Sequence, residues 1–201
     1  MKSTSLTLAL LVLAFAPACK SKGPKGVGFL DDYSKLTPAT QAERKNSWNW
    51  FKPGIDLRKY DYLLIDPIVV MGAKGSATEK LSDDLKKRAT DGFRNVLFET
   101  IDPYYSVVKE PGAHVLRVRI ALTDLTPDEG EGEGSASLEG ELIDAQSGEK
   151  LAAFISTVQG SKGGWRAEKK WLAVEGAFIA WSKRLLEYMD SFHEDAEIEG
   201  A

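Results

Sequence analysis

Apolar and polar residues alternate with different periods along this chain, and each period indicates one kind of element. Residues 62–71 (YLLIDPIVVM) form an apolar run that only Asp66 and Pro67 interrupt. The run predicts a largely buried strand. A bend, bulge or edge is expected at Pro67, because proline has no N–H to donate to a neighbouring strand.

Two helices are predicted where apolar residues recur every three or four positions. Between Ser76 and Thr100 the spacing is helical, with Ser76 or Thr78 as the capping residue and Asp102-Pro103 as the stop. A second apolar stripe predicts a helix at residues 168–191, facing a core. The acidic C-terminal end after it is expected to be frayed.

Four stretches between these helices read as strands: residues 105–109, 114–125, 135–144 and 151–159. In the second stretch Arg117 and Arg119 occupy the polar side, and in the third Glu139 and Glu141 do. If the two strands are neighbours, these side chains face one another on the solvent side of the sheet. Such cross-strand pairs contribute about 0.2–1 kcal/mol each.

The order of these elements predicts a single α+β domain at residues 29–201, built as a two-layer sandwich. Its sheet is expected to be mainly antiparallel, with four or five strands, and both helices are expected to cover one face. The first strand can run parallel to a neighbour, because a helix connects it to the strands that follow.

The N-terminus has a different pattern. Lys2 precedes an apolar stretch at residues 6–15 (LTLALLVLAF), and small residues then lead to Cys19, the only cysteine in the chain. The stretch is shorter than the roughly 20 apolar residues that a transmembrane helix needs. Residues 1–18 are therefore predicted to be a signal peptide that is cleaved on export.

Two processing routes fit these residues. Ala16-Pro17-Ala18 has the form cut by an ordinary signal peptidase, which would leave an unpaired thiol in an oxidising compartment. The other route resembles a bacterial lipobox, although Ala16 stands where leucine is usual. It explains the single cysteine, so Cys19 is the predicted lipidation residue, and several acyl chains anchor a protein firmly. Lys20 resembles an outer-membrane sorting signal, because it is not aspartate.

The residues after the cysteine are predicted to connect the anchor to the domain. Residues 19–28 form the lipidated N-terminus and a flexible tether, rich in lysine and glycine. Residues 29–59 read as an extended arm that wraps around the domain and carries Trp48 and Trp50. Together with Trp165, these rings either pack against the core or form a binding platform that stacks on a sugar or a peptide.

Four blocks of the chain carry a family resemblance: GFLDDYSKLTP (28–38), DLRKYDYLLIDPIVV (56–70), PGAHVLRVRIALTDLTP (111–127) and SLEGELIDAQSGEKLAAF (137–154). In this order they resemble the bacterial lipoprotein family with domain of unknown function 3313 (DUF3313). The resemblance implies a signal peptide, lipidation at Cys19 and a compact α/β domain outside the cytoplasm. It implies no reaction and no catalytic residues.

Few residues are suited to a catalytic or metal site. His114 and His193 are the two histidines, and the chain has no sequence motif for an activated serine. The loop at residues 71–80 joins a strand to a helix but lacks the order of a phosphate-binding loop. Adjacent carboxylates such as Asp31 and Asp32 point in different directions in extended chain. We therefore expect no metal, no cofactor and no enzymatic activity.

Composition adds one exclusion. The chain is 43% hydrophobic and 28% charged, with a formal net charge of -4, which is typical of a globular domain and gives no basic surface for nucleic acid. We expect a lipoprotein of the bacterial cell envelope, held by its acyl chains, in the outer membrane facing the periplasm. It would bind an envelope protein or another envelope component. The alternative is a periplasmic glycan-binding, small-molecule-binding or hydrolytic domain that uses exposed tryptophans.

Overall fold

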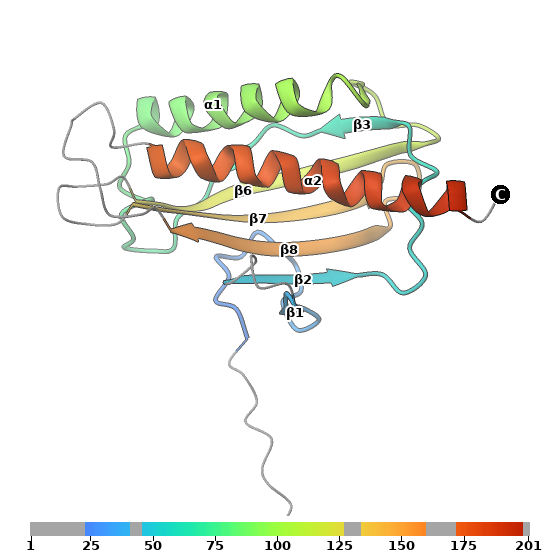
Figure 1. Ribbon diagram of the computed structural model, residues 1–201. Coiled ribbons are helices and arrows are strands. Elements are labelled where there is room, and N and C mark those ends of the chain that lie inside the picture. The colour runs from blue at the N-terminus through green and yellow to red at the C-terminus, as the bar shows by residue number, and fades with distance from the viewer. Residues whose placement is uncertain (1–22, 41–45, 127–133, 160–171, 199–201) are drawn as a thin grey trace, which may run out of the picture.

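The computed structural model describes residues 23–40, 46–126, 134–159 and 172–198, the last range without the side chains of residues 172–173 and 191–198. In these residues two helices cover one face of an eight-stranded sheet (Figure 1). The strands are β1 (Thr37–Pro38), β2 (Ser47–Phe51), β3 (Tyr62–Ile65), β4 (Val69–Val70), β5 (Ser106–Val107), β6 (Val115–Thr126), β7 (Ser135–Asp144) and β8 (Lys150–Gln159). The helices are α1 (Asp83–Ile101) and α2 (Leu172–Ile198). The predicted α+β architecture is confirmed.

The sheet is mixed. Its strand order is β1-β2-β8-β7-β6-β3-β5, with β4 paired to β6. The first five strands in this order are antiparallel neighbours, whereas β3 is parallel to β6 and to β5, and β4 is parallel to β6. The expected parallel first strand is confirmed. Four of the seven strand pairings in the described sheet are antiparallel. The predicted number of four or five strands is wrong, because the segment read as an arm supplies β1 and β2, and a break at residues 66–68 divides the first predicted strand into β3 and β4.

The segment predicted as an extended arm contributes β1 and β2 to the sheet. β2 pairs with β8 over five residues, from Ser47 opposite Ser156 to Phe51 opposite Ala152. Successive side chains of a strand point to opposite faces. Trp48 therefore lies on the face away from the helices, whereas Phe51 packs against the core under α2.

The helices have different bounds from those predicted. α1 begins after Ser82, whose hydroxyl oxygen accepts a hydrogen bond from the N–H of Leu85 at 3.4 Å. Thr78, a predicted cap, is buried, and its hydroxyl oxygen instead accepts the N–H of Leu125 at 2.7 Å. α2 continues to Ile198, past the predicted end at residue 191.

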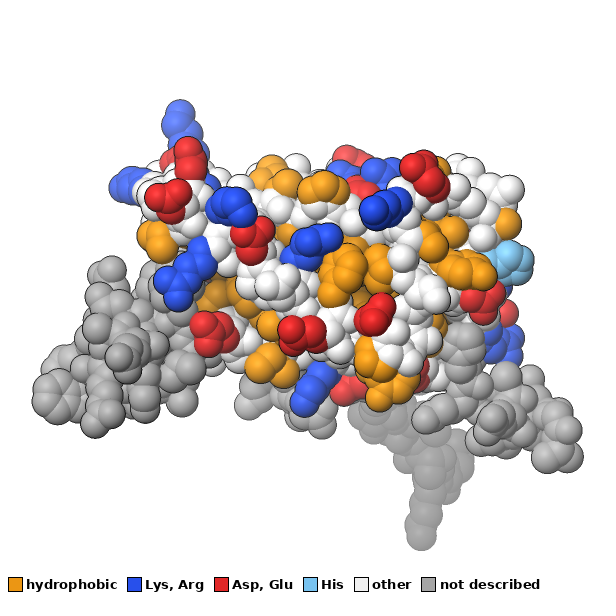
Figure 2. All heavy atoms as spheres, turned by 90° about the horizontal axis from the view of Figure 1, so that it is seen from above, with side chains coloured by type: hydrophobic (Ala, Val, Ile, Leu, Met, Phe, Trp, Pro, Cys, Tyr) orange, Lys and Arg blue, Asp and Glu red, His pale blue; other side chains and the backbone are white. Residues whose placement is uncertain are grey.

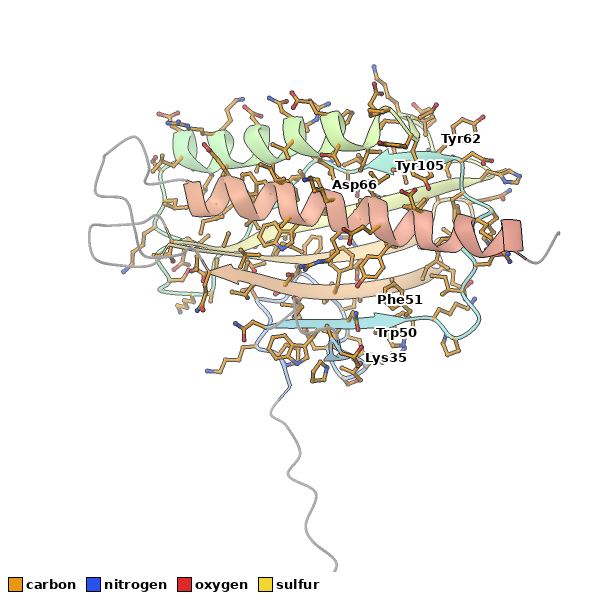
Figure 3. All side chains as sticks on the ribbon, in the orientation of Figure 1. Lys35, Trp50, Phe51, Tyr62, Asp66 and Tyr105 are labelled. Carbon is orange, nitrogen blue, oxygen red and sulfur yellow. The ribbon has the colours of Figure 1, made fainter. Side chains whose placement is uncertain are left out.

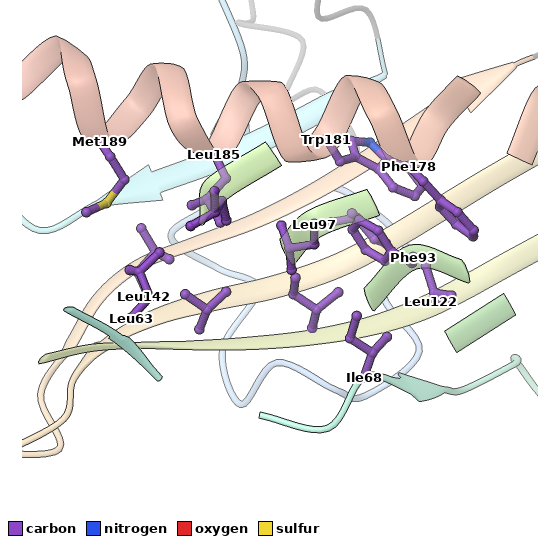
Figure 4. Close-up of a cluster of buried hydrophobic side chains, with 14 of the residues drawn as sticks. Leu63, Ile68, Phe93, Leu97, Leu122, Leu142, Phe178, Trp181, Leu185 and Met189 are labelled. Atoms are coloured by element: carbon purple, nitrogen blue, oxygen red, sulfur yellow. The ribbon is translucent and has the colours of Figure 1, made fainter. Parts of the chain in front are cut away.

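One hydrophobic core lies between the helices and the sheet (Figure 4). Phe93 of α1 and Phe178 of α2 stack with ring centroids 4.8 Å apart, and Trp181 lies 5.8 Å from Phe93. A fully buried side chain of this size contributes about 1.5–3 kcal/mol.

Neither described helix is long and apolar enough to span a membrane.

Candidate functional site

The face of the sheet opposite the helices, here called the outer face, carries an unusual set of charges. Strand alternation places Arg119 of β6 opposite Glu141 of β7, and their side chains bond at 2.8 Å. This pairing was predicted. Glu139 and Glu141 are only 1% and 0% exposed, however, so the prediction of a solvent-side ladder is wrong. Arg117 also differs, because it forms two 2.8 Å bonds with Asp66 in the β3–β4 connection.

Residues 27–36, here called the N-terminal clasp, cover these glutamates. The Glu139 carboxylate accepts hydrogen bonds from the N–H of Val27 at 2.7 Å, from the N–H of Leu30 at 3.4 Å and from the hydroxyl of Tyr33. Burial and the bond to Glu139 raise the pKa of the Tyr33 phenol, so the hydroxyl stays a donor. Glu139 is thus an anchor for chain more than 100 residues upstream.

A second set of contacts fixes the clasp to neighbouring strands. Phe29 covers the Arg119 guanidinium, 5.1 Å from ring centroid to Cζ. Lys150 of β8 lies between the Glu141 carboxylate and Asp31, with 3.4 Å to the latter. Burial opposes the charge of Lys150, but both carboxylates stabilise it, and the net effect raises its pKa. The side chain of Asp31 is 86% exposed, so its ion pair with Lys150 contributes up to about 1 kcal/mol to holding the clasp.

Trp48 and Trp50 lie on the same outer face, opposite Ile155 and Ala153 of β8. Both rings are half-buried and pack with apolar residues of the clasp. Two of the three rings considered for a binding platform therefore lie beside the clasp, packed against apolar side chains and partly exposed. Trp165 and the lipidation residue Cys19 lie outside the described residues.

Trp50 borders a hollow of about 400 Å³, which is also lined by Asp32, Lys35, Lys52, Glu149, Lys150 and Ala153. The Lys35 ammonium lies 5.0 Å from the Trp50 ring centroid, and Figure 3 shows both side chains at the β1–β2 end of the sheet, away from Tyr62. Lys52 pairs with Glu149 at 2.6 Å. Local carboxylates therefore neutralise the lysines, and the hollow offers an aromatic edge with polar groups rather than an anion site.

A polar cluster on the other face was not predicted. The Ser156 hydroxyl accepts hydrogen bonds from Trp181 Nε1 at 3.1 Å and from Arg184 Nη1 at 2.9 Å, and Ser47 Oγ lies 3.0 Å away. A hydroxyl accepts two bonds and donates one, so Ser156 donates to Ser47. None of these groups is a base that could take its proton, and the cluster is not an activated serine.

The remaining sequence candidates have local partners. His114 is exposed, and its Nδ1 lies 2.7 Å from the carbonyl oxygen of Lys59. In the loop at 71–80, the N–H of Gly75 donates to the carboxylate of Glu79. Among the described residues, no three His, Cys, Asp or Glu side chains are grouped to hold a metal. The side chain of His193 lies outside the described part of the chain.

The N-terminal clasp that covers the outer face was not predicted. Alternation assigned Glu139 and Glu141 to the correct side, but the chain that covers them was read as tether and arm. Phe29, Leu30 and Leu36 were the available signal. Three large apolar residues in a short polar stretch suggest that the stretch packs against something.

Comparison with known structures gives relatives in fold only. Protein XCC0632 from Xanthomonas campestris has a TM-score of 0.50 and 12% identity over 73% of this chain and 93% of that one. PelC from Paraburkholderia phytofirmans, solved as a dodecamer, has a TM-score of 0.45 and 15% identity over 71% and 96%. Lipoprotein GNA1162 from Neisseria meningitidis has a TM-score of 0.38 and 9% identity over 64% and 99%. At these identities the likeness extends to the fold alone.

No curated protein matches the chain. A family model described as a protein of unknown function, DUF3313, matches residues 25–130. The matched region holds the clasp and strands β1 to β6, and it is more than half of the sequence. The chain therefore belongs to the DUF3313 family.

Proposed function

We propose that this protein is a lipid-anchored lipoprotein of the bacterial envelope whose domain binds an envelope partner and catalyses no reaction. The anchor is Cys19, acylated after cleavage of residues 1–18. Lys20 then directs the protein to the outer membrane, where the domain faces the periplasm. The apolar export segment, the single cysteine and the family resemblance support this proposal.

The short stretch of sequence between Cys19 and the folded domain is the main support for this proposal. Val27, only eight residues after Cys19 in the sequence, is already bonded to Glu139 in the middle of the sheet. A chain that joins its fold so soon after the cysteine holds the domain directly beside the anchor. This arrangement suits a protein that works at a membrane surface, since a fully extended stretch of eight residues spans at most about 29 Å.

The chemistry of the described residues supports a binding role. The polar groups on both faces of the sheet are engaged with one another: Glu139 with the clasp, Glu141 with Arg119 and Lys150, and Ser156 with donors. The helical face carries charged side chains of both signs with apolar side chains between them (Figure 2). A shallow groove of about 280 Å³ runs between α1 and α2 on that face.

Intact-mass spectrometry of the membrane-extracted protein tests the anchor. We expect a mature N-terminus at Cys19 with the added mass of acyl chains. Cys19→Ala should give an unlipidated protein that leaves the membrane fraction. Recovery of wild-type protein cut at Cys19 without lipid mass would contradict the proposal.

Density-gradient separation of the two membranes tests whether Lys20 directs the protein to the outer membrane, with Lys20→Asp as the matched variant. Wild-type protein should collect in the outer membrane and the variant in the inner membrane. In-cell crosslinking followed by mass spectrometry then tests for the partner. Recovery of no specific envelope partner from cells that make normal amounts of lipidated protein would count against a binding role.

The hollow beside Trp50 favours a second candidate function, the binding of a glycan through ring stacking. Titration with chitotetraose, followed by tryptophan fluorescence, tests this reading. Binding by the wild type that Trp50→Ala abolishes and Trp50→Phe keeps would support it. A wild-type spectrum that does not change with the sugar would exclude this glycan as a ligand of the hollow.

A further inference from the structure

The N-terminal clasp has a consequence for how the domain sits on the membrane, and this inference rests on the proposed acylation of Cys19. Among the described residues, the N–H of Val27 forms an early hydrogen bond to the sheet, with the carboxylate of Glu139. Gly26 lies so close to the Tyr33 ring that a side chain at position 26 would overlap it. The position of the chain is therefore fixed from residue 26 onwards, on the outer face near the middle strand, β7.

The tether is too short for the domain to turn over. Val27 is eight residues from Cys19, so the two are at most about 29 Å apart. β7 has three strands on each side within the described sheet. To bring the helices against the bilayer, the chain would have to cross three strands, about 14 Å at 4.8 Å each, and then pass the side-chain layer, the sheet and a helix, roughly 20 Å more. This path of roughly 35 Å exceeds the reach of the tether.

The outer face also has side chains suited to a headgroup region. Trp50 is half-buried at its rim, next to the hollow, and Lys35 and Lys52 flank it with 59% and 40% of their side chains exposed. Tryptophan rings favour the membrane interface, and a rim on which Lys35 and Lys52 pair with Asp32 and Glu149 suits zwitterionic headgroups, which carry both charges. In Figure 1 the described chain starts, in blue, on the side of the sheet away from both helices.

From these observations we propose that the outer face, with Trp50, Lys35 and Lys52 at its rim, is the surface that rests against the bilayer in which Cys19 is anchored. The helices α1 and α2 then point away from the membrane. The occupant of this surface is the phospholipid headgroup layer. The helical face is left to the envelope partner.

The test uses a feature of the sequence. Cys19 is the only cysteine, and acylation blocks its sulfur, so an introduced cysteine is the only free thiol. Lys52→Cys places a fluorophore on the outer-face rim, and Lys87→Cys places one on α1. The two sites are matched, because each lysine is exposed and loses one surface ion pair, with Glu149 and Asp91 respectively.

Both variants are reconstituted, as full-length lipidated protein, into vesicles of phosphatidylethanolamine and phosphatidylglycerol that contain a headgroup-labelled quencher lipid. We expect several-fold stronger quenching at position 52 than at position 87. Equal quenching, or stronger quenching at position 87, would overturn the orientation. Intact mass of the same samples separates the two proposals: absence of lipid at Cys19 defeats the anchor, whereas lipidated protein with equal quenching defeats only the orientation.

A longer tether supplies the second arm of the test. A Gly/Ser insert of about 20 residues after Ser21 has a root-mean-square span of roughly 25 Å and removes the length limit. The difference between positions 52 and 87 should then narrow. A difference that stays undiminished would overturn the argument from tether length.

Discussion

Replacement of Glu139 by glutamine changes the acceptor that holds the N-terminal clasp but keeps the size of the side chain. The carboxylate accepts hydrogen bonds from the N–H groups of Val27 and Leu30 and from the Tyr33 hydroxyl. An amide side chain has one acceptor oxygen and an NH₂ group that only donates. At least one of the three donors in the clasp therefore loses its partner.

The size of the destabilisation in Glu139→Gln follows from the strengths of these hydrogen bonds. A hydrogen bond to a charged group contributes about 1.5–3 kcal/mol and one to a neutral group about 0.5–1.5 kcal/mol, so each surviving bond weakens by about 1 kcal/mol. The orphaned donor costs a further 1–3 kcal/mol or so. Burying an amide is cheaper than burying a carboxylate, which offsets part of this loss. We expect a net destabilisation of the docked clasp of about 2 kcal/mol, a factor of roughly 30 in its opening equilibrium.

Amide hydrogen exchange measured by mass spectrometry resolves this effect along the chain. In Glu139→Gln, peptides that cover residues 26–36 should exchange about 30-fold faster than in the wild type, as expected for local opening of a docked segment. Peptides from the β7–β8 hairpin should change little. Glu149→Gln, at an exposed glutamate with one surface partner, is the matched control and should leave the clasp unchanged.

Two results would refute this reasoning. Wild-type exchange rates at residues 26–36 in Glu139→Gln would mean that the carboxylate does not hold the clasp. Equal acceleration in the clasp and in the hairpin would mean that the substitution destabilises the whole domain rather than one segment.

Three further perturbations test other parts of the structure. Gly26→Ala should destabilise the domain by about 1–3 kcal/mol because the new methyl group overlaps an aromatic ring, whereas Gly23→Ala, which meets no atom within 4 Å, should be neutral in urea unfolding. The pKa of Asp144 is lowered: burial opposes its charge, but hydrogen bonds from the following turn and from a tyrosine outweigh that. A lowered folded-state pKa gives stability that is complete above the unfolded pKa and is lost progressively as the pH falls towards the folded pKa. The difference in unfolding free energy between wild type and Asp144→Asn should therefore be full at neutral pH and should shrink as the pH falls below about 4. Ser156→Ala should cost about 1–3 kcal/mol in urea unfolding because the buried Nε1–H of Trp181 loses the acceptor oxygen of Ser156. Ser182→Ala, which removes a buried hydroxyl without a partner among the described residues, should be neutral or stabilising; a loss as large as that of Ser156→Ala would contradict this account.

Sequence periodicity predicted the helices and long strands because each has enough residues to show its own period. β7 was predicted with its observed bounds, and β6 and β8 to within one residue. Val69 and Val107 lie within predicted strands, but β1 was not predicted, because a two-residue strand has no period of its own. Thr37 and Pro38 form a strand because β2 supplies the pairing, and that partner is set by tertiary structure.

The outer face shows a different limit of sequence reasoning. The spacing of Glu139 and Glu141 correctly placed both on one face, but two glutamates flanking a glycine are normally solvated. Their burial depends on a segment that ends more than 100 residues earlier. Gly140 has a local reason of its own, because the Phe154 ring occupies the space where its side chain would be.

The strength of the clasp depends on what Glu139 does when the clasp opens. Among the described residues Glu139 has no cationic partner, and its bonds all come from the clasp. Opening returns the carboxylate to water, which replaces those bonds, so each bond stabilises docking only by its net advantage over hydration. Burial of the apolar side chains Leu30 and Leu36, 3% and 8% exposed, adds to that stability. Glu139 also sets the register, because only a segment that presents two N–H groups and a hydroxyl at this point can cover the carboxylate without leaving it unpaired.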